Sequence, residues 1–397
     1  MPLPPIYLDH AATTPVRPEA REAMLPFLSE AAFGNPSSSH QFGRSARAGL
    51  EHARQQIAAA LGVETRDVLF TSGGTEADNM AVLGVALEHL FGERRRAHLV
   101  STPTEHKAVL ASLHQAQAFG ARVTLLPVDR DGVADLGVLE QLLRGADADL
   151  PTLVSVMWVN NETGAIQPIA RIAERCAAAG VPFHTDAVQA FGKVPVDLKS
   201  LPVTFATLSA HKIGGPKGVG ALFVRDRRGV RGIVHGGSQQ GGLRPGTENI
   251  AGAVGFGVAA ELATGEQPRV SQELRAIRDV LQAALLARVP DLVVHAAGAE
   301  RGPSILSVSA PGTDSEAMLM HLDLAGLACA SGSACTTGAV EPSHVLAAMG
   351  ATRDLSTAAV RFSFGSLSRP DQVPRIAETY AKVVAKVRGL RAGLSRG

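Results

Sequence analysis

The sequence predicts an α/β fold with a large domain, whose mainly parallel sheet is flanked by helices, and a smaller α+β domain toward the C-terminus. Three observations lead to this prediction. Strand-like and helix-like stretches alternate through the first two thirds of the chain, as parallel sheets require. The chain has 397 residues, which is long for a single core. A break at Gly265–Pro268 precedes a long charged amphipathic stretch. We therefore place the large domain at 16–264 and the small domain at 1–15 and 265–397.

The expected elements follow in chain order from apolar spacing, cap residues and turn residues. Helices are expected at 18–29, 45–61, from 75 onward, at 105–118, 169–179, 251–262 and 271–288. Strands are expected at 68–70, 97–101, 123–127, 153–159, 181–185, 203–208 and 221–224, and in the last third near 292–295, 305–309 and 360–364. A polar glycine-rich loop covers 236–247.

Composition excludes several classes of protein. Lys plus Arg number 38 against 37 Asp plus Glu, a formal net charge of +1, so nothing favours direct binding of nucleic acid or of an anionic membrane. No stretch approaches the ~18 consecutive apolar residues of a membrane span. The first residues, MPLPPIYLDH, lack the basic and apolar regions of a signal peptide. Three cysteines make no disulfide framework, and we expect a cytoplasmic protein.

Polar residues follow several of the expected strands. Thr75, His106, Asn161, Asp186 and Lys212 each lie just after such a strand. The carboxyl ends of parallel strands meet at one edge of a sheet, where ligands bind. These five side chains are therefore expected to converge on a single site.

The stretch SAHKIGGPKGVGAL, from Ser209 to Leu222, turns the chain between two apolar strands. A lysine held there, Lys212, can lose its solvation and form a Schiff base with an aldehyde, or it can simply point to water from a tight hairpin. The turn TSGGTE at 71–76 opens a helix whose bare N–H groups suit a phosphate, but taken alone this is a weak signal, and a plain capped turn is the more common explanation. Neither stretch alone shows which of its two interpretations is correct.

Together, the motifs resemble those of the cysteine desulfurases, pyridoxal-phosphate enzymes of the class V aminotransferase group. The resemblance runs from Tyr7 through Gly365 and rests on YLDHAATTP, GNPSSSH, TSGGTEADN, TEHKAV, VNNETGAIQPI, HTDAVQAFGKVPVD, SAHKIGGPKGVGAL, LRPGTENI, SGSACTTGAVEPSH and VRFSFG. SGSAC followed by EPSH is similar to the nitrogen-fixation and iron–sulfur-assembly branch. The resemblance implies the fold type I of pyridoxal-phosphate-dependent transferases.

This resemblance also implies how the cofactor, pyridoxal 5′-phosphate, is held. Lys212 is expected on its aldehyde carbon, Asp186 beside its pyridinium nitrogen, Gln189 at its phenolic oxygen and His106 on its ring face. These roles suit a cofactor that acts as an electron sink.

For the phosphate, the resemblance implies Thr75, Ser209 and His211, with the backbone at Gly74. A threonine of the glycine-rich loop reaches the phosphate of the neighbouring subunit in this family, and Thr247 holds that position here. A homodimer with shared sites is therefore expected.

The resemblance assigns the substrate to Arg361 and Asn161. An arginine inside an apolar strand needs a buried partner, and a substrate carboxylate gripped bidentately would supply one; a structural salt bridge is the alternative. Lys212 would move the α-proton of L-cysteine. Cys335, in a mobile loop at about 328–340, would attack the substrate sulfur, keep it as a persulfide and release L-alanine.

No resident metal is expected, although Cys335 is a possible transient iron–sulfur ligand. Cys329 is interpreted as a small core residue, with a resolving or metal-holding role as the alternative, and Cys176 as structural. Two features depart from the family pattern. His10 stands where the family usually has Asn, and the C-terminus, RAGLSRG, lacks the tail of members that bind an iron–sulfur scaffold.

The predicted function is therefore a cysteine desulfurase that passes sulfur to an acceptor protein, for iron–sulfur cluster assembly or tRNA thiolation. A selenocysteine lyase, a class V aminotransferase and a non-catalytic pyridoxal-phosphate-binding partner remain as alternatives. Transamination needs no thiol, so Cys335 favours the desulfurase. The sequence does not name the acceptor, and a further cofactor pathway also stays open.

Overall fold

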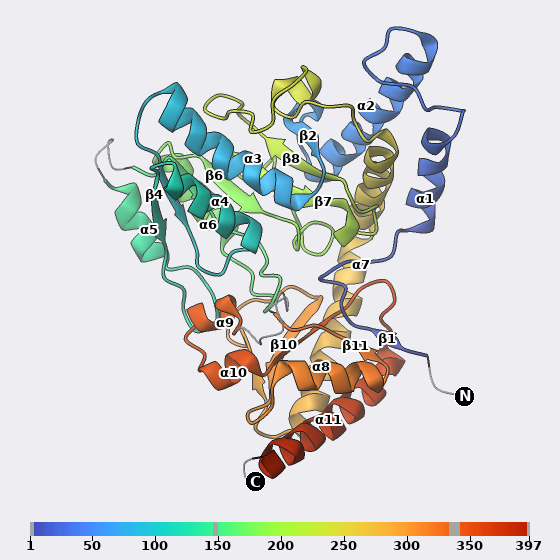
Figure 1. Ribbon diagram of the computed structural model, residues 1–397, viewed down its shortest axis with the longest axis vertical. Coiled ribbons are helices and arrows are strands. Elements are labelled where there is room, and N and C mark those ends of the chain that lie inside the picture. Colours follow the sequence, from blue (N-terminus) through green and yellow to red (C-terminus); the bar gives the residue numbers. More distant parts are fainter. Residues whose placement is uncertain (1–3, 146–149, 333–341, 395–397) are drawn as a thin grey trace.

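A computed structural model describes residues 4–145, 150–332 and 342–394 of the chain. The molecule has two parts along its long axis (Figure 1): a larger part above, built on a central sheet, and a smaller part below, with a sheet of its own. Cys335, the expected nucleophile, and most of its loop lie outside the described residues.

The central sheet has seven strands in the order β2-β8-β7-β6-β5-β3-β4. Their bounds are β2 Val68–Thr71, β3 His98–Ser101, β4 Arg122–Leu125, β5 Leu153–Ser155, β6 Phe183–Asp186, β7 Phe205–Ser209 and β8 Gly220–Val224. Only β8 runs antiparallel to its neighbours β2 and β7; the other neighbouring pairs are parallel. The mainly parallel sheet predicted from the sequence is confirmed, and six of its seven strands, all except β8, end at the same edge.

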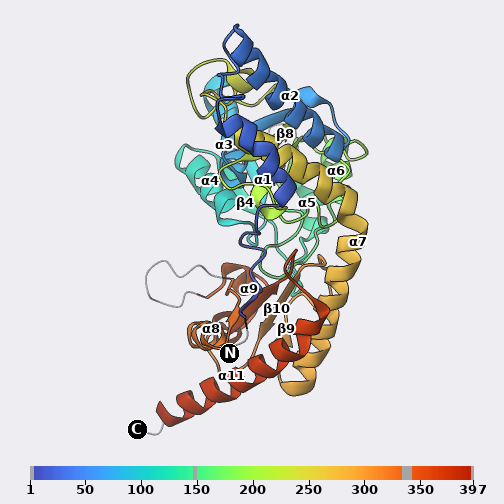
Figure 2. The same ribbon diagram turned by 90° about the vertical axis from the view of Figure 1, so that its right-hand side faces the viewer.

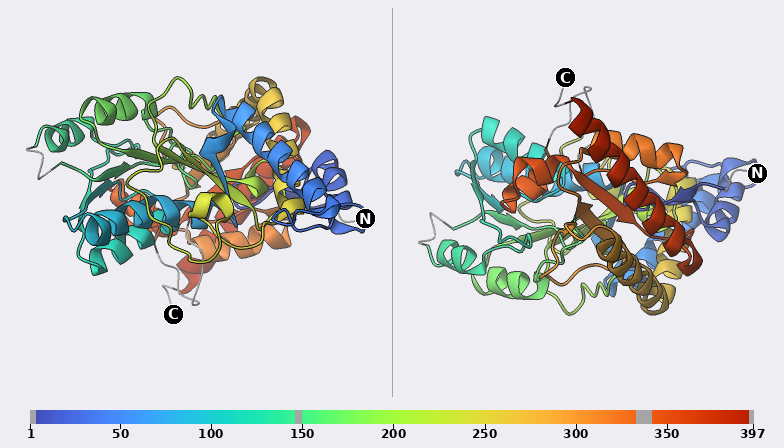
Figure 3. Two further views of the ribbon diagram at one scale, coloured as in Figure 1. Left: turned by 90° about the horizontal axis from the view of Figure 1, so that it is seen from above. Right: turned by 90° about the horizontal axis from the view of Figure 1, so that it is seen from below.

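Helices cover both faces of this sheet (Figure 3). One face packs against helices α2 Gln41–Leu61, α5 Leu136–Leu143, α6 Ile169–Ala178 and the first half of α7 Ile250–Arg288. The other face packs against α3 Gly74–Leu87 and α4 Lys107–Ala118. Because both faces are covered, the strands are buried along their whole length, except in the edge strand β4. The short helix α1 Pro18–Met24, which a 3-10 turn extends to Leu28, packs on α7.

The smaller part is built on an antiparallel sheet of order β12-β10-β9, with bounds β9 Val293–Val294, β10 Ile305–Ser309 and β12 Ala359–Ser363. A second, two-stranded sheet pairs β1 Ile6–Tyr7 with β11 Leu327–Ala328, so the N-terminal segment belongs to this part. Its helices are α8 Ser315–Leu324, α9 His344–Ala348, α10 Arg353–Thr357 and α11 Val373–Leu394.

One expectation about the boundary region is wrong. The break predicted at Gly265–Pro268 does not exist, because α7 runs unbroken from Ile250 to Arg288 with Pro268 inside it. A proline inside a helix costs about 3 kcal/mol, but α7 is buried on both sides of it: Ala253 to Ala263 in the large core, Leu274 to Leu285 in the small one. Figure 2 shows α7 extending along one side of the molecule from the larger part into the smaller part. The domain limits at 264 and 265 themselves stay a prediction.

Smaller differences concern short elements. Helix α5 was not predicted, and β5 is three residues long rather than the predicted 153–159. No helix in the described ranges combines the length and apolar character that crossing a membrane requires.

Candidate active site

A cavity of about 660 Å³ lies between the carboxyl edge of the central sheet and the smaller part of the chain. The sheet side contributes loops that follow β2, β6 and β7, while the other side contributes the N-terminal segment and residues near β11 and β12. Ten residues singled out from the sequence line it: Gly74, Thr75, His106, Asn161, Asp186, Gln189, Ser209, His211, Lys212 and Arg361. The convergence expected from strand ends is therefore present in the structure.

Lys212 ends a 3-10 turn, Ala210–Lys212, inside the hairpin between β7 and β8. Its Nζ atom donates to the carbonyl oxygens of Ala11 at 2.5 Å and Ala12 at 2.7 Å. Burial and, after it, the Arg361 charge lower the pKa of Lys212 to about 8, against the opposing effect of Asp186 and Asp9. The hairpin is real, but its lysine turns into the cavity instead of toward bulk water.

The floor of the cavity carries two buried carboxylates. Asp186 ends β6, Asp78 lies on α3, and one ligand atom of each lies within 4.8 Å of the other and of a His106 nitrogen. Burial raises the pKa of both acids; the Asp186 charge raises the pKa of Asp78 further, while His106 and Lys212 act to lower the pKa of Asp186. Asp186 accepts the backbone N–H of Val188 at 2.9 Å, but it has no ion-pair partner among the described residues. A buried carboxylate without a cation is costly, so this floor favours a cationic ligand.

His106 precedes α4 as its N-cap, and its Nδ1 accepts the N–H of Ala108 at 3.1 Å. This bond leaves the proton of the neutral ring on Nε2. The ring opens onto the cavity, and partial removal of water lowers the pKa of His106, against the opposing pull of Asp186. His106 is therefore a neutral N–H donor near neutral pH.

One end of the cavity has the features of an anion site. Helix α3 begins at Gly74, and the first N–H groups of any helix have no helical carbonyl to bind. Thr75, Ser209 and His211 add hydroxyl and imidazole groups there. A Cβ atom at Gly74 would approach Val188 Cγ2 to 3.0 Å, so a side chain would crowd this end. Burial lowers the pKa of His211 to about 4, which leaves its ring neutral.

Gln189 lies deeper, with both ends of its amide engaged. Its Nε2 donates to the Ala11 carbonyl at 2.8 Å, and its Oε1 accepts from Lys193 Nζ at 2.7 Å. Lys193 is buried, and burial lowers its pKa to about 7. The sequence analysis did not single out Lys193, although it lies inside the motif HTDAVQAFGKVPVD.

Arg361, in β12, is buried at the cavity wall. Its Nη2 donates to Asp9 Oδ1 at 2.7 Å and its Nη1 donates to the Asn161 carbonyl at 2.8 Å, while its buried Nε has no partner in the described part of the chain. The structural salt bridge left open from the sequence is therefore present. It coexists with a guanidinium whose Nε–H donor is not used by any described residue. Asn161 contacts Arg361 through its backbone, not its amide.

Further lining residues were missed as site residues, although most lie inside the motifs already noted. Glu162 is buried and accepts from Ser343 Oγ at 2.5 Å, and His344 contacts the Glu105 carbonyl at 3.0 Å. Cys329 is half-buried: it lines the cavity and also packs against the core of the smaller part. Burial raises the pKa of its thiol to about 12, so it stays protonated. Membership in a motif was the only signal that could have found these residues.

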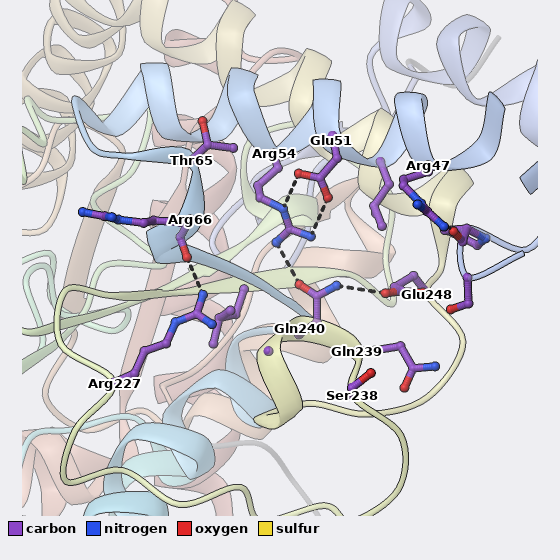
Figure 4. Close-up of a pocket in the computed structure, with 15 residues that line it drawn as sticks. Arg47, Glu51, Arg54, Thr65, Arg66, Arg227, Ser238, Gln239, Gln240 and Glu248 are labelled. Carbon is purple, nitrogen blue, oxygen red and sulfur yellow. Dashed lines mark hydrogen bonds and ion pairs between the residues drawn. The ribbon is translucent and has the colours of Figure 1, made fainter. Parts of the chain in front are cut away.

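Thr247 does not line this cavity; it is exposed in the glycine-rich loop. That loop borders a second cavity of about 580 Å³ beside α2 (Figure 4). There Gln240, with a φ of 50°, points inward and its Oε1 accepts from Arg54 Nη1 at 2.8 Å and the Phe70 N–H at 3.0 Å. Arg54 also pairs with Glu51 at 3.3 Å. Gln240 thus anchors the loop that carries Thr247.

Comparisons with known proteins agree with one another. Residues 6–376 match the family model described as aminotransferase class-V. The chain is 44% identical over 390 residues to a protein named cysteine desulfurase IscS from an Anaeromyxobacter species, covering 98% of this chain and 93% of that one. It is 40% identical over 383 residues to a protein of the same name from Dictyoglomus turgidum, covering 96% and 95%. A solved structure described as a NifS-like protein superposes with a TM-score of 0.87 at 34% identity, covering 96% of this chain and 99% of that chain.

Proposed function

The chain belongs to the aminotransferase class-V family, and from this premise we propose how its cavity divides the work between cofactor and substrate. The chain is a pyridoxal-phosphate-dependent cysteine desulfurase. The roles of individual residues are our proposal, and the observation that carries it is the set of buried charges at the cavity floor: Asp186 without a cation and Lys212 with a lowered pKa.

The described residues fit the groups of pyridoxal phosphate. Asp186 offers its charge to a protonated pyridine nitrogen, Lys212 its amine to the aldehyde, and Gln189 an amide N–H to the phenolic oxygen. The phosphate suits the start of α3 at Gly74, with Thr75, Ser209 and His211 around it. When bound, the cofactor supplies an electron sink next to the α-carbon of the amino acid.

Substrate binding falls to Arg361 in this proposal. A guanidinium grips a carboxylate through two parallel N–H donors, and Arg361 has a free buried Nε beside an Nη2 that now bonds Asp9. L-Cysteine would share or displace Asp9, while Asn161 Nδ2 stays available, since only its backbone is engaged by Arg361.

Two groups handle protons. Lys212, with its pKa lowered to about 8, is matched to taking and returning the α-proton near neutral pH. His106 would lie on the ring face of the cofactor, and its Nε2–H, left by the bond that Nδ1 accepts from Ala108, could donate a proton to a reacting atom.

Sulfur leaves on Cys335, which we propose as the nucleophile. The Cys335 thiolate attacks the sulfur of L-cysteine, the carbon–sulfur bond breaks, and a sulfur–sulfur bond forms on the enzyme. A proton completes L-alanine, so one L-cysteine gives one L-alanine and one persulfide. Cys329, with its raised pKa, is unsuited to this role because a thiolate is needed. A transient iron–sulfur contact of Cys335 stays part of the proposal.

We propose that the functional unit is a homodimer in which Thr247 reaches the partner's phosphate. Thr247 is exposed and away from its own cavity, on a loop anchored by Gln240, as a residue serving another subunit should be. The persulfide then passes to an acceptor protein, an iron–sulfur scaffold or a tRNA-thiolation enzyme, in the cytoplasm. Sedimentation of the purified protein tests the dimer: a monomer with full activity would contradict a shared site.

The function is tested by measuring sulfide and L-alanine from L-cysteine with a thiol reductant, in wild type and Cys335→Ala. We expect equal amounts of both products from wild type and almost none from the variant. The Cys329→Ala variant serves as the matched control and should keep most activity. Wild type that binds the cofactor but yields neither product would point to amino-group transfer or to selenocysteine as substrate.

A further inference from the structure

Lys193 is a buried cation without a counter-charge. It is 9% exposed, lies in the turn after β6, and forms no ion pair with any described residue. Its Nζ makes one recorded hydrogen bond, to Gln189 Oε1 at 2.7 Å. Lysine is rarely buried unless it is paired, so this arrangement calls for an explanation.

The charged groups that surround Lys193 make its burial less favourable still. The pKa of Lys193 is lowered first by burial and then by the positive charges of Lys212 and Arg361. Lys193 in turn lowers the pKa values of His10 and His211. These four groups come from the N-terminal segment, the hairpin and β12, and all of them are basic. An anionic ligand in the cavity is the natural source of the missing negative charge.

The contacts of Gln189 show how the charge of Lys193 reaches the cavity. Lysine has no acceptor, so the Lys193 contact requires Oε1 of Gln189 on that side. The Ala11 carbonyl has no donor, and its contact requires Nε2 on the other side. The amide orientation is therefore fixed from both ends, and the second N–H of Nε2 is the donor that the Gln189 side chain can offer to an anionic ligand.

We propose that Lys193 is a positioning residue, which acts through Gln189 to make a charge-assisted hydrogen-bond donor for the phenolic oxygen of the cofactor. The Lys193 charge polarises the amide, and the amide stabilises that oxygen in its anionic form. Hydrogen bonds aligned in this way strengthen one another in a low-dielectric site. This inference rests on the proposed function, because it assumes pyridoxal phosphate in the cavity.

The test compares two ligands that differ only at that oxygen. Apoprotein of wild type, Lys193→Met and Lys193→Gln is titrated with pyridoxal phosphate and with 3-deoxypyridoxal phosphate, and the two dissociation constants are measured for each protein. We expect Lys193→Met to raise the dissociation constant of pyridoxal phosphate by about tenfold or more, which is the effect typical of losing a hydrogen bond to a charged group. Binding of the deoxy analogue should change less than twofold. Lys193→Gln keeps a hydrogen-bond donor but not the charge, so its dissociation constant for pyridoxal phosphate should lie between those of wild type and Lys193→Met.

Lys199→Met, which removes an exposed lysine six positions later, is the matched control and should leave both constants unchanged. If Lys193→Met weakens both ligands equally, Lys193 has a structural role and the inference is overturned. If Lys193→Met does not fold, the same comparison is made with Lys193→Gln: the change in its dissociation constant for pyridoxal phosphate is compared with the change for the deoxy analogue. Wild type that binds no pyridoxal phosphate would instead refute the proposed function, so the two failures are distinguishable.

Discussion

The cavity at the sheet edge and the cavity beside the glycine-rich loop have similar volumes, about 660 and 580 Å³, and both are lined by charged residues. They differ in how those charges are satisfied. In the second cavity, buried Arg54 bonds Glu51, Gln240 and the Val68 carbonyl, and one oxygen of Glu248 is left without a partner. At the first, Asp186 in the lining and Lys193 behind Gln189 both lack an ion-pair partner among the residues that the structure describes.

The difference distinguishes a ligand site from a structural cavity, whose charged side chains pair within the chain and hold a loop in place. Buried charge is costly unless paired, so a chain keeps it unpaired only where something else pairs with it. Arg54 and Gln240 pair within the chain and hold a loop in place. The charges at the sheet edge are arranged for a molecule that brings a cation to Asp186 and anions to the Gly74 and Lys193 sides.

The strongest way to break this comparison is Asp186→Asn. We expect kcat/KM for L-cysteine to fall by about 100-fold or more, the scale of a lost electrostatic contact at a reacting group. The apoprotein should lose no stability, because the substitution removes a buried charge that has no partner. Steady-state kinetics and urea unfolding of the apoprotein measure both. Asp323→Asn, at an exposed carboxylate, is the control; an apoprotein made several kcal/mol less stable by Asp186→Asn would mean that its charge is paired within the chain.

Arg361→Lys tests the substrate side of the same cavity. A lysine keeps the charge but loses the bidentate grip, so we expect KM for L-cysteine to rise by about tenfold, with a smaller effect on kcat. The Asp9 ion pair can re-form with a lysine, and the unfolding free energy should therefore change little. Unchanged KM with reduced stability would instead assign Arg361 to the salt bridge with Asp9 alone.

Gln240→Leu tests the structural cavity. The substitution leaves Arg54 Nη1 and the Phe70 N–H without their acceptor, and we expect a loss of about 1–3 kcal/mol of unfolding free energy. Gln239→Leu, at the neighbouring half-exposed position, is the control. Urea unfolding of the apoprotein gives both values. An unfolding free energy of Gln240→Leu equal to that of wild type would show that the bonds of Gln240 do not stabilise the fold, and it would remove the contrast between the two cavities.

The smallest effect is a dependence of apoprotein stability on pH. The folded pKa values of Lys193 and Lys212, about 7 and about 8, lie below the unfolded value of about 10.4. Between these limits the unfolded chain binds more protons, so stability rises with pH. Glu105, with its pKa raised to about 8, acts in the opposite direction below that pH. Above pH ~8.5 the thiols of Cys176 and Cys329, whose pKa values burial raises to about 12, act against the two lysines, so the lysine effect is read as a difference between two proteins. Between pH ~8.5 and ~9.5 we expect the unfolding free energy of wild type to rise by about 1 kcal/mol relative to that of Lys193→Met; a difference that does not change with pH would contradict this.

Much of this arrangement could be predicted from the sequence, because strand ends follow from local patterns. Asp186 and His106 each follow a short apolar run, and parallel pairing brings such positions to one edge. The Lys193–Gln189 contact could not be predicted, since neither side chain signals its burial locally. The unbroken α7 was missed for a similar reason: Pro268 is a local stop signal, but burial of the helix in two cores, through Phe256 and Leu281, outweighs it.

The central claim is that the unpaired charges at the sheet edge serve sulfur removal from L-cysteine onto Cys335. The most direct test is to mix cofactor-loaded protein with L-cysteine without a reductant, count the L-alanine released, and weigh the peptide that contains Cys335. We predict one L-alanine for each peptide that gains the mass of one sulfur atom. L-Alanine released while the Cys335 peptide keeps its original mass would contradict the account.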